Sequence, residues 1–300
     1  CNLGWMYGQG RGVEIDDEQA AYWFERAATQ GDKQAQFNLG NLYIAGQGVP
    51  QDERRAAFWF VQAAQQGDVE AQFNLGNLYF HGNGVTQDDR RAARWFEKAA
   101  QQGHAKAQTA LGILYLNQSR HSASEELAQG QRWLEQAAAQ HEAAAESILG
   151  TYEAMIKENI AAAKRHWENA AARGDSDAMQ WLALLYLDGD SGVPQDQAKA
   201  LAWWQKASDA GNTEAAYRLA EAYLNGRYGL PKDLQQGFRY MKQAAEGGHA
   251  VAALRLSQMY QAGSGTHADP VQAAQWLNRY QAWDTDRYYS LKQLLRKLEN

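Results

Sequence analysis

Apolar residues recur along this 300-residue chain with the spacing of helices that bury one face. Between residues 71 and 79 they lie at i, i+4, i+7 and i+8: Ala71, Leu75, Leu78 and Tyr79. A second set follows a polar, glycine-containing gap: Ala92, Trp95, Phe96, Ala99 and Ala100. Both sets have the period of an amphipathic helix. The pattern therefore predicts a pair of helices, which we call helix A and helix B, joined by a short turn.

The same pair of patterns returns along most of the chain, at first in steps of 36 residues. One leucine in each unit anchors helix A: Leu3, Leu39, Leu75, Leu111, Leu149, Leu182, Leu219 and Leu256. In nearly every unit an alanine precedes this leucine by four residues and a tyrosine follows it by four. Self-similarity at a fixed step of this length is typical of helical repeat arrays. We therefore expect an all-α stack of about eight helix pairs.

Glycine and aspartate mark the predicted helix ends. Gly82 and Gly84 follow helix A, where a left-handed residue after the last turn favours glycine. Asp88 precedes helix B, where its side chain is expected to cap the free N–H groups. Asp52 and Asp196 stand at the same place in their own units, so we expect the same cap there.

The segment Gly46-Gln47-Gly48 has the glycine spacing of a phosphate-binding loop. Such loops, however, follow a strand, open a helix and continue with further glycines or a Gly-Lys-Ser/Thr ending. Here the glycines follow a predicted helix, recur in several units and are joined by no such lysine. We therefore interpret Gly46, Gly48, Gly82 and Gly84 as turn residues that bind no nucleotide.

The combined pattern is A-x-x-x-L-G-x-x-Y-x-x-G-x-G-V-x-x-D-x-x-x-A-x-x-W-x-x-x-A-A-x-x-G, and it resembles the Sel1-like repeat, a relative of the tetratricopeptide repeat. The resemblance covers about residues 1–280 and is strongest in the units of Leu39 and Leu75. It implies a right-handed α-solenoid that acts as a scaffold or adaptor for protein partners, and a repeat without catalytic residues. It also implies a bacterial protein that is exported or periplasmic, with a cytoplasmic location as the alternative.

Two middle units depart from the pattern. The unit of Leu111 replaces the Gly-x-Gly turn with residues 117–121 and lengthens it by two residues. The unit of Leu149 shortens the same region by three residues and places His166 in the column that holds tryptophan elsewhere.

The two ends of the chain differ from each other. Cys1-Asn2-Leu3-Gly4 aligns with Phe37-Asn38-Leu39-Gly40, so we expect Cys1 to lie partway along a helix of a truncated first repeat. The repeat pattern should then continue upstream, with alanine two residues before Cys1. At the other end, a leucine stripe predicts a helix over 283–300 that caps a solenoid over 1–282: Leu291, Leu294, Leu295 and Leu298.

Composition narrows the classes of partner. The net charge is −6 and no basic run is long enough to follow a phosphate backbone, so nucleic acid is not the expected partner. No apolar run approaches the ~18 residues of a membrane span, so we expect no membrane insertion by this fragment. Cys1 is the single cysteine, which excludes an intramolecular disulfide.

The residues that perform chemistry are dispersed. No histidine lies four residues from another histidine or near a cysteine pair, so zinc-site patterns are absent. His104 and His249 occupy the helix-start column, and no G-x-S-x-G motif occurs. One column of tryptophans is expected to be core: Trp23, Trp59, Trp95, Trp133, Trp203 and Trp276. The sequence therefore predicts no catalytic, metal-binding or cofactor-binding residue and no cofactor.

Sequence information for binding must lie in columns that the repeat leaves free. On helix A, the residue before the anchoring leucine and the residue two after it share one face. Along the chain these positions change from amide to apolar to charged, and an apolar centre with a tryptophan is typical of an interface. We call the predicted partner-binding residues the helix-A strip: Asn38, Asn41, Asn74, Asn77, Ile113, Ile148, Trp181, Leu184, Arg218 and Arg255. The alternative is that the irregular middle units bury its apolar members.

These patterns favour a non-enzymatic scaffold that binds a protein or peptide along the helix-A surface. An inhibitor or immunity-type protein that blocks a partner enzyme is an alternative that the sequence does not separate from an adaptor. An enzyme with an unrecognised site is the second alternative, and it would need a cluster of acid, base or ligand residues outside the repeat columns.

Overall fold

The computed structural model describes residues 1–118, 124–190 and 192–283. These residues form helices and turns, and none of the described residues belongs to a strand; Asp190 and Val193 form one isolated bridge. The predicted all-α class is therefore confirmed. The chain divides into two compact units, Cys1–Ala145 and Glu146–Asn300, and each is described by itself below.

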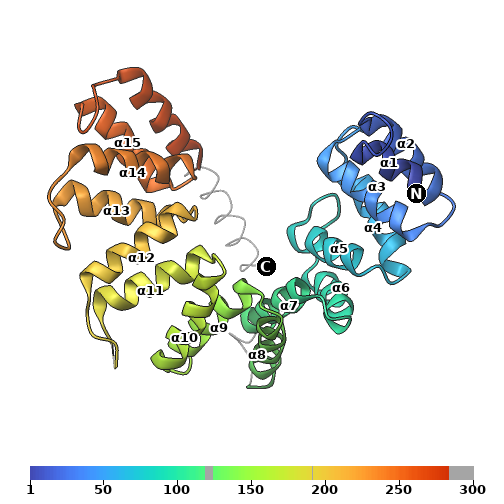
Figure 1. Cartoon of the computed structure of the whole chain (residues 1–300), viewed down its shortest axis with the longest axis horizontal. Helices are drawn as coiled ribbons and strands as arrows, with labels where there is room; N and C mark the ends of the chain where they lie inside the picture. Colours follow the sequence, from blue (N-terminus) through green and yellow to red (C-terminus); the bar gives the residue numbers. More distant parts are fainter. Residues whose placement is uncertain (119–123, 191, 284–300) are drawn as a thin grey trace, which may run out of the picture. The chain divides into compact units, whose positions relative to one another are not determined.

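Helices of the first unit follow one another in pairs, as Figure 1 shows. They are α1 (Asn2–Gln9), α2 (Asp17–Ala28), α3 (Lys33–Ala45), α4 (Glu53–Gln65), α5 (Val69–His81), α6 (Asp89–Gln101), α7 (Ala105–Gln118), α8 (Ser124–Ala139) and the start of α9 (Ala143–Met155). Within this unit α3 packs on α4, α5 on α6 and α7 on α8. These are the predicted A and B helices of successive repeats.

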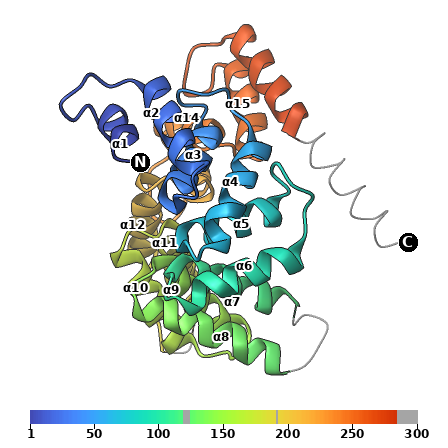
Figure 2. The same cartoon turned by 90° about the vertical axis from the view of Figure 1, so that its right-hand side faces the viewer.

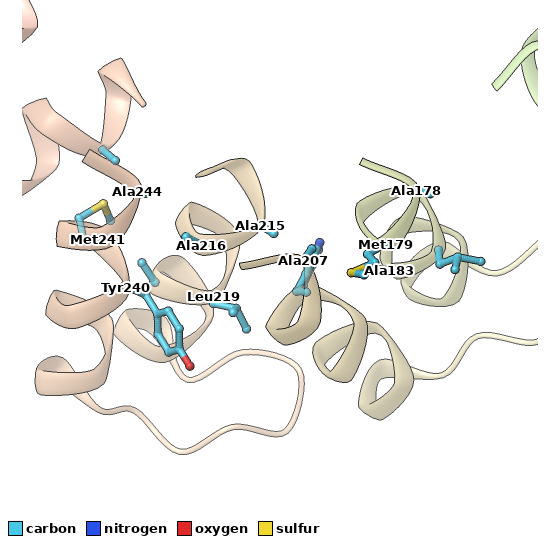
Figure 3. Packing of buried hydrophobic residues seen from close by; sticks show 14 of the residues in the cluster. Ala178, Met179, Ala183, Ala207, Ala215, Ala216, Leu219, Tyr240, Met241 and Ala244 are labelled. Carbon is cyan, nitrogen blue, oxygen red and sulfur yellow. The ribbon is translucent and has the colours of Figure 1, made fainter. Parts of the chain in front are cut away.

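The second unit repeats this arrangement. Its helices are the remainder of α9, α10 (Ile160–Ala172), α11 (Ser176–Asp188), α12 (Gln197–Asp209), α13 (Thr213–Asn225), α14 (Leu234–Glu246) and α15 (Ala250–Ala262), followed by helical residues 270–283. Figure 3 shows its core, in which Ala216 and Leu219 of α13 lie between α12 and α14. Ala207 and Tyr240 are the facing residues from those two helices.

The predicted caps and turns are confirmed. Asp52, Asp88 and Asp196 are N-caps whose side chains accept backbone N–H groups in the first turns of α4, α6 and α12. Gly46 and Gly48 have φ of 67° and 65°, which is the left-handed region that favours glycine. A Cβ atom on Gly48 would lie 1.9 Å from the backbone oxygen of Asp17, so close packing also requires this glycine.

The most deeply buried column of helix B lies one residue after the predicted tryptophan column. Five of the six column tryptophans are only partly buried, and Trp276 alone among the six is buried, at 5 % exposure. The following residue is the core residue in most repeats: Phe24, Phe60, Phe96, Leu134, Trp167, Trp204 and Met241. The prediction that the tryptophan column is core was therefore wrong for five members, because the rotation of helix B turns the next residue toward helix A.

A ladder of buried glutamines links successive repeats in the first unit. The Nε2 atom of Gln72 donates to the carbonyl of Ala64 at 3.1 Å, and its Oε1 accepts from Nε2 of Gln102 at 2.8 Å. Gln36 and Gln108 make the same two kinds of bond in their repeats. The ladder gives each of these helix-end carbonyls a second donor and joins the end of one helix B to the next helix A.

The irregular repeats behave as predicted where they are described. The connection between α9 and α10 spans 156–159, compared with 46–52 between α3 and α4, so the three-residue shortening is confirmed. Most of the lengthened turn at 117–121 and nearly all of the predicted capping helix at 283–300 lie outside the described residues.

Cys1 is the N-cap of α1, and its carbonyl accepts from the backbone nitrogen of Trp5 at 3.2 Å. Its side chain is partly buried against the core of the first unit. Leu3 differs from the other anchoring leucines, because it is 45 % exposed whereas each of the others is at most 2 % exposed.

Candidate functional site

The amide end of the helix-A strip lies on α3 and α5 of the first unit. Nδ2 of Asn74 donates to Oδ1 of Asn41 at 3.4 Å, which joins two successive repeats. Oδ1 of Asn38 accepts from Gln34 at 3.5 Å. The Nδ2 atom of Asn38, however, is buried and finds no hydrogen-bond partner in the described part of the chain.

Asn38 and Asn41 also line a hollow of about 270 Å³ between α1, α2 and α3. Trp5 and Gln9 contribute from α1, and Gln47 contributes from the turn after α3. The hollow thus combines amide groups with the aromatic rings of Trp5 and Phe24, and the amides suit hydrogen bonding to a peptide backbone.

The apolar centre of the strip is divided between the two units. Ile113 lies on α7 of the first unit, whereas Ile148, Trp181 and Leu184 lie in the second, and all four are partly buried. Trp181 stacks on the buried Trp167 with ring centroids 5.9 Å apart and an interplanar angle of 13°. Trp181 and Leu184 both pack against the core of their unit, so they are neither open surface nor full core.

The charged end of the strip lies on α13 and α15. Nε of Arg218 donates to Oε1 of Glu214 at 2.6 Å, and Nε2 of His249 lies 3.0 Å from Oε2 of the same carboxylate. Burial raises the pKa of Glu214, but hydrogen bonds from His249 and Arg218 more than offset it, so the pKa is lowered. Arg218 therefore forms an exposed ion pair with Glu214, one turn earlier on the same helix.

Arg255 is exposed and has no ion-pair partner among the described residues. It lines a hollow of about 280 Å³ between α13 and α15, together with Glu221, Asn225 and Gln258. Because its guanidinium is unpaired, Arg255 is the strip cation that remains available to a partner's carboxylate.

His249 is structural, as predicted for the helix-start column. Its Nδ1 atom accepts the backbone N–H of Ala252 at 3.1 Å, and its ring stacks on Tyr217 with centroids 4.6 Å apart. His104 makes the equivalent bond to the nitrogen of Ala107 at 3.0 Å. In both cases Nδ1 accepts a backbone N–H group and so caps the start of a helix.

The shortened repeat contains one carboxylate–imidazole pair. Nδ1 of His166 lies 2.7 Å from Oε2 of the buried Glu146, and Nδ2 of Asn169 lies 3.3 Å from the other carboxylate oxygen. Glu146 occupies the glutamine column and His166 the tryptophan column, so the pair replaces one link of the glutamine ladder. No nucleophile accompanies it among the described residues that contact Glu146.

Sequence patterns missed two hollows that border α6. One of about 620 Å³ lies between α4 and α6, and one of about 230 Å³ lies between α6 and α7. Arg94 lines both of them. The sequence signal that could have indicated them is the charge of helix B, which differs from repeat to repeat.

In the described residues, no group of three or more His, Cys, Asp or Glu side chains is arranged to hold a metal ion. None of the helices among the described residues combines the length and apolar character that crossing a membrane requires.

Comparison with known proteins identifies the repeat. The Sel1 repeat family model matches eight consecutive segments: 1–32, 33–68, 69–104, 105–142, 143–175, 176–212, 213–249 and 250–279. No curated protein matches the chain significantly.

Solved structures of Sel1 repeat proteins resemble this chain over most of its length. The protective antigen c5321 of uropathogenic Escherichia coli strains, which displays an SLR fold, is 28% identical; the match covers 100% of this chain and 72% of that one, with a TM-score of 0.62. A Sel1 repeat protein from Oxalobacter formigenes is 28% identical over 82% of this chain and 98% of its own, with a TM-score of 0.70.

The immunity protein Pa5087 from Pseudomonas aeruginosa is 17% identical over 76% of this chain and 81% of its own, with a TM-score of 0.51. At this identity the likeness concerns the fold alone. The eight matched segments, the glycine turns and the solenoid relatives agree with one another, and the chain belongs to the Sel1 repeat family.

Proposed function

We propose that this protein is a non-enzymatic scaffold that binds a protein or an extended peptide along the helix-A strip. Proteins built from Sel1 repeats generally mediate protein–protein interactions. The proposal adds the surface and the residues to that general role. The likeness to the immunity protein is confined to the fold, so it does not favour an inhibitor over a scaffold.

The observation that supports this proposal most directly is the unpartnered Nδ2 of Asn38. A buried donor without an acceptor costs about 1–3 kcal/mol. Asn38 lines the 270 Å³ hollow beside Asn41. A backbone carbonyl of a bound peptide would satisfy this donor and remove the cost.

The opposite end of the strip offers a different chemistry. Arg255 lines its hollow without an ion pair to any described residue, so it suits a carboxylate. Trp181 and Leu184 each keep part of their surface exposed, so they can add apolar contact to an interface centre. Arg218 already forms an ion pair with Glu214, so it contributes to the orientation of a bound partner more than to its affinity.

The variant Asn38→Leu separates a binding role from a structural one. Leucine has a similar volume and removes the buried donor, so the melting temperature should stay equal or rise. Partner capture from native cell extract should fall, as it should for Arg255→Glu. Lys242→Ala, an exposed change on α14, is the matched control and should leave capture unchanged.

A photo-crosslinking residue placed at Asn41, Leu184 or Gln258 should label the captured protein. The same residue placed at Arg165 or Lys242, which are exposed on α10 and α14, should not label it. Equal labelling from all five positions would show that the strip is not the binding surface. A wild-type chain that captures no protein would refute the scaffold function itself.

A further inference from the structure

We propose that α6 and the two hollows beside it bind an acidic segment of a partner protein, with a partner side chain that is aromatic or aliphatic inserted next to α6. This inference rests on the proposed function, because it presupposes a protein partner. It adds a second contact region, outside the helix-A strip, and names the chemistry of what binds there.

The larger hollow is lined by charge and aromatic surface. Its cations are Arg91, Arg94 and Lys98, against a single carboxylate, Glu97. Its volume of about 620 Å³ is within the usual range of pockets that take a small ligand or a few side chains. The chain as a whole has a net charge of −6, so this excess of cations is a local exception.

Two of these cations are partly committed to neighbours. Nε of Arg91 lies 3.2 Å from Oδ2 of Asp88, and its guanidinium lies 5.6 Å from the ring centroid of Tyr79. Nζ of Lys98 lies 4.3 Å from the ring centroid of Trp95. These contacts hold both side chains against α6, so they lose little conformational freedom when a carboxylate binds.

Arg94 differs from both. It is exposed and forms no ion pair with any described residue, yet it lines the larger and the smaller hollow. A guanidinium presents parallel N–H groups that fit a carboxylate bidentately. Arg94 is therefore the side chain that a carboxylate reaches from either side of α6.

The smaller hollow supplies the apolar contact. It lies where α6 packs on α7, and Figure 2 shows these two helices side by side. Its lining includes Ala93 of α6 and Leu111, Leu114 and Tyr115 of α7, next to Arg90 and Arg94. A volume of about 230 Å³ accepts one aromatic or aliphatic side chain, whose burial contributes about 1.5–3 kcal/mol.

Single cations recur at the positions of Arg91, Arg94 and Lys98 in other B helices, but of α4, α6 and α14 only α6 has a cation at all three. Three, six and ten residues after its N-cap, α6 has Arg91, Arg94 and Lys98. At these positions α4 has Arg55, Phe58 and Gln62, and α14 has Gln236, Arg239 and Gln243. Because the fold tolerates neutral residues there, packing does not require three cations on one helix.

The helices before α6 present aromatic surface at the position of Arg94. Tyr22 of α2 is 48 % exposed and Phe58 of α4 is 55 % exposed. Large aromatic side chains left in solvent are typical of interaction surfaces. The same position in three successive B helices of this unit therefore carries two aromatic rings and one unpaired cation, which suits a partner segment that mixes carboxylates with apolar residues.

A nucleic acid is the other polyanion that such a surface suggests. It is disfavoured because three cations on one helix do not form the long basic track that a phosphate backbone follows, and the chain has a net charge of −6. A peptide places a few carboxylates and one apolar side chain at defined positions, which matches one cationic helix flanked by two hollows.

The test selects a phage-displayed library of random peptides on the full 300-residue chain and measures the affinity of the selected peptides by fluorescence anisotropy. We expect peptides rich in Asp and Glu with at least one aromatic or aliphatic residue, and weaker binding at higher salt. Arg94→Glu should weaken them about tenfold or more. Arg165→Glu, the same charge change at the same position of α10, should not.

Because Arg94 is exposed, the melting temperature of Arg94→Glu should match that of wild type, and Arg94→Ala provides a milder second variant. Selected peptides that bind both Arg94 variants as tightly as wild type would overturn the inference, while their binding would still support a scaffold. A library that yields no acidic peptide would also overturn it and leave the capture experiments on the helix-A strip as the independent test. Binding of a single-stranded oligonucleotide that is lost in Arg94→Glu, without acidic peptide binding, would assign the surface to nucleic acid instead.

Discussion

The change Trp181→Ala measures how much of the apolar strip belongs to the core. The indole of Trp181 is partly buried and stacks on Trp167, which is itself only 4 % exposed. Truncation removes this stack and uncovers the face of Trp167. A freely exposed tryptophan would lose neither contact.

The expected cost follows from burial and stacking. A tryptophan buries about 150–250 Å², and the low end of that range suits a ring that keeps an exposed edge. At ~25 cal/mol per Å² this burial contributes about 4 kcal/mol. The stack adds about 1 kcal/mol, and compactness of the unfolded chain reduces the burial contribution by about a third. We therefore expect Trp181→Ala to lower the free energy of unfolding by about 3.5 kcal/mol.

Urea unfolding followed by circular dichroism at 222 nm, a wavelength that reports helix content, measures this change. Trp5→Ala is the matched control, because Trp5 is 45 % exposed and its ring lies 5.3 Å from the guanidinium carbon of Arg11. It should cost about 1 kcal/mol or less. A loss below about 1 kcal/mol for Trp181→Ala would refute the stacked geometry and return Trp181 to the open surface.

Three further perturbations test the packing and the charge network. Gln72→Ala removes two hydrogen bonds of the buried glutamine ladder and should cost about 1–3 kcal/mol in urea unfolding, whereas the exposed Gln101→Ala should stay within about 0.5 kcal/mol. Gly76→Ala would place a Cβ atom 2.6 Å from the buried ring of Phe96 and should lower the free energy of unfolding by about 1–3 kcal/mol. In Gly8→Ala the new Cβ atom meets only Ala20, at 3.7 Å, so this variant should be more stable than wild type by up to about 1 kcal/mol. Equal melting temperatures for the two variants would contradict this packing. Because the pKa of Glu214 is lowered from 4.5, its ion pairs stabilise the fold above that pH and are lost as the pH falls through the folded-state value; Glu214→Gln should therefore flatten the acid limb of the unfolding midpoint, and an unchanged limb would argue against the network with Arg218 and His249.

The helices, turns and family followed from the sequence because their signals are local. A helix face repeats within four residues, and an N-cap or a left-handed glycine is specified by the residue that stands there. Asp88 and Gly46 accordingly have the predicted roles. Each of these signals occurs in several repeats, so a unit that matches the repeat pattern weakly could still be recognised from the units beside it.

The candidate site was predictable only as a set of columns. Sequence spacing placed Asn38 and Arg255 on the free face of helix A, but whether a side chain there is paired depends on the next repeat. Asn74 reaches Asn41 across 33 residues, whereas the Nδ2 atom of Asn38 finds no described partner. The stack of Trp181 on Trp167 was equally invisible, because it depends on the rotation of α11 against α10.

The sequence by itself therefore determined the class of fold, the number of repeats and the helix ends, since period, caps and turn glycines act over a few residues. Only the tertiary structure decided which residue of each aromatic pair is core, which amides form the ladder and which cations remain unpaired. Those outcomes depend on helix rotation, and a rotation by one residue moves burial from Trp95 to Phe96 without changing the apolar pattern. Arg91 pairs with Asp88 three residues earlier at the start of its own helix, which is a local contact, whereas only the packing of α6 beside α4 and α7 leaves Arg94 facing two hollows.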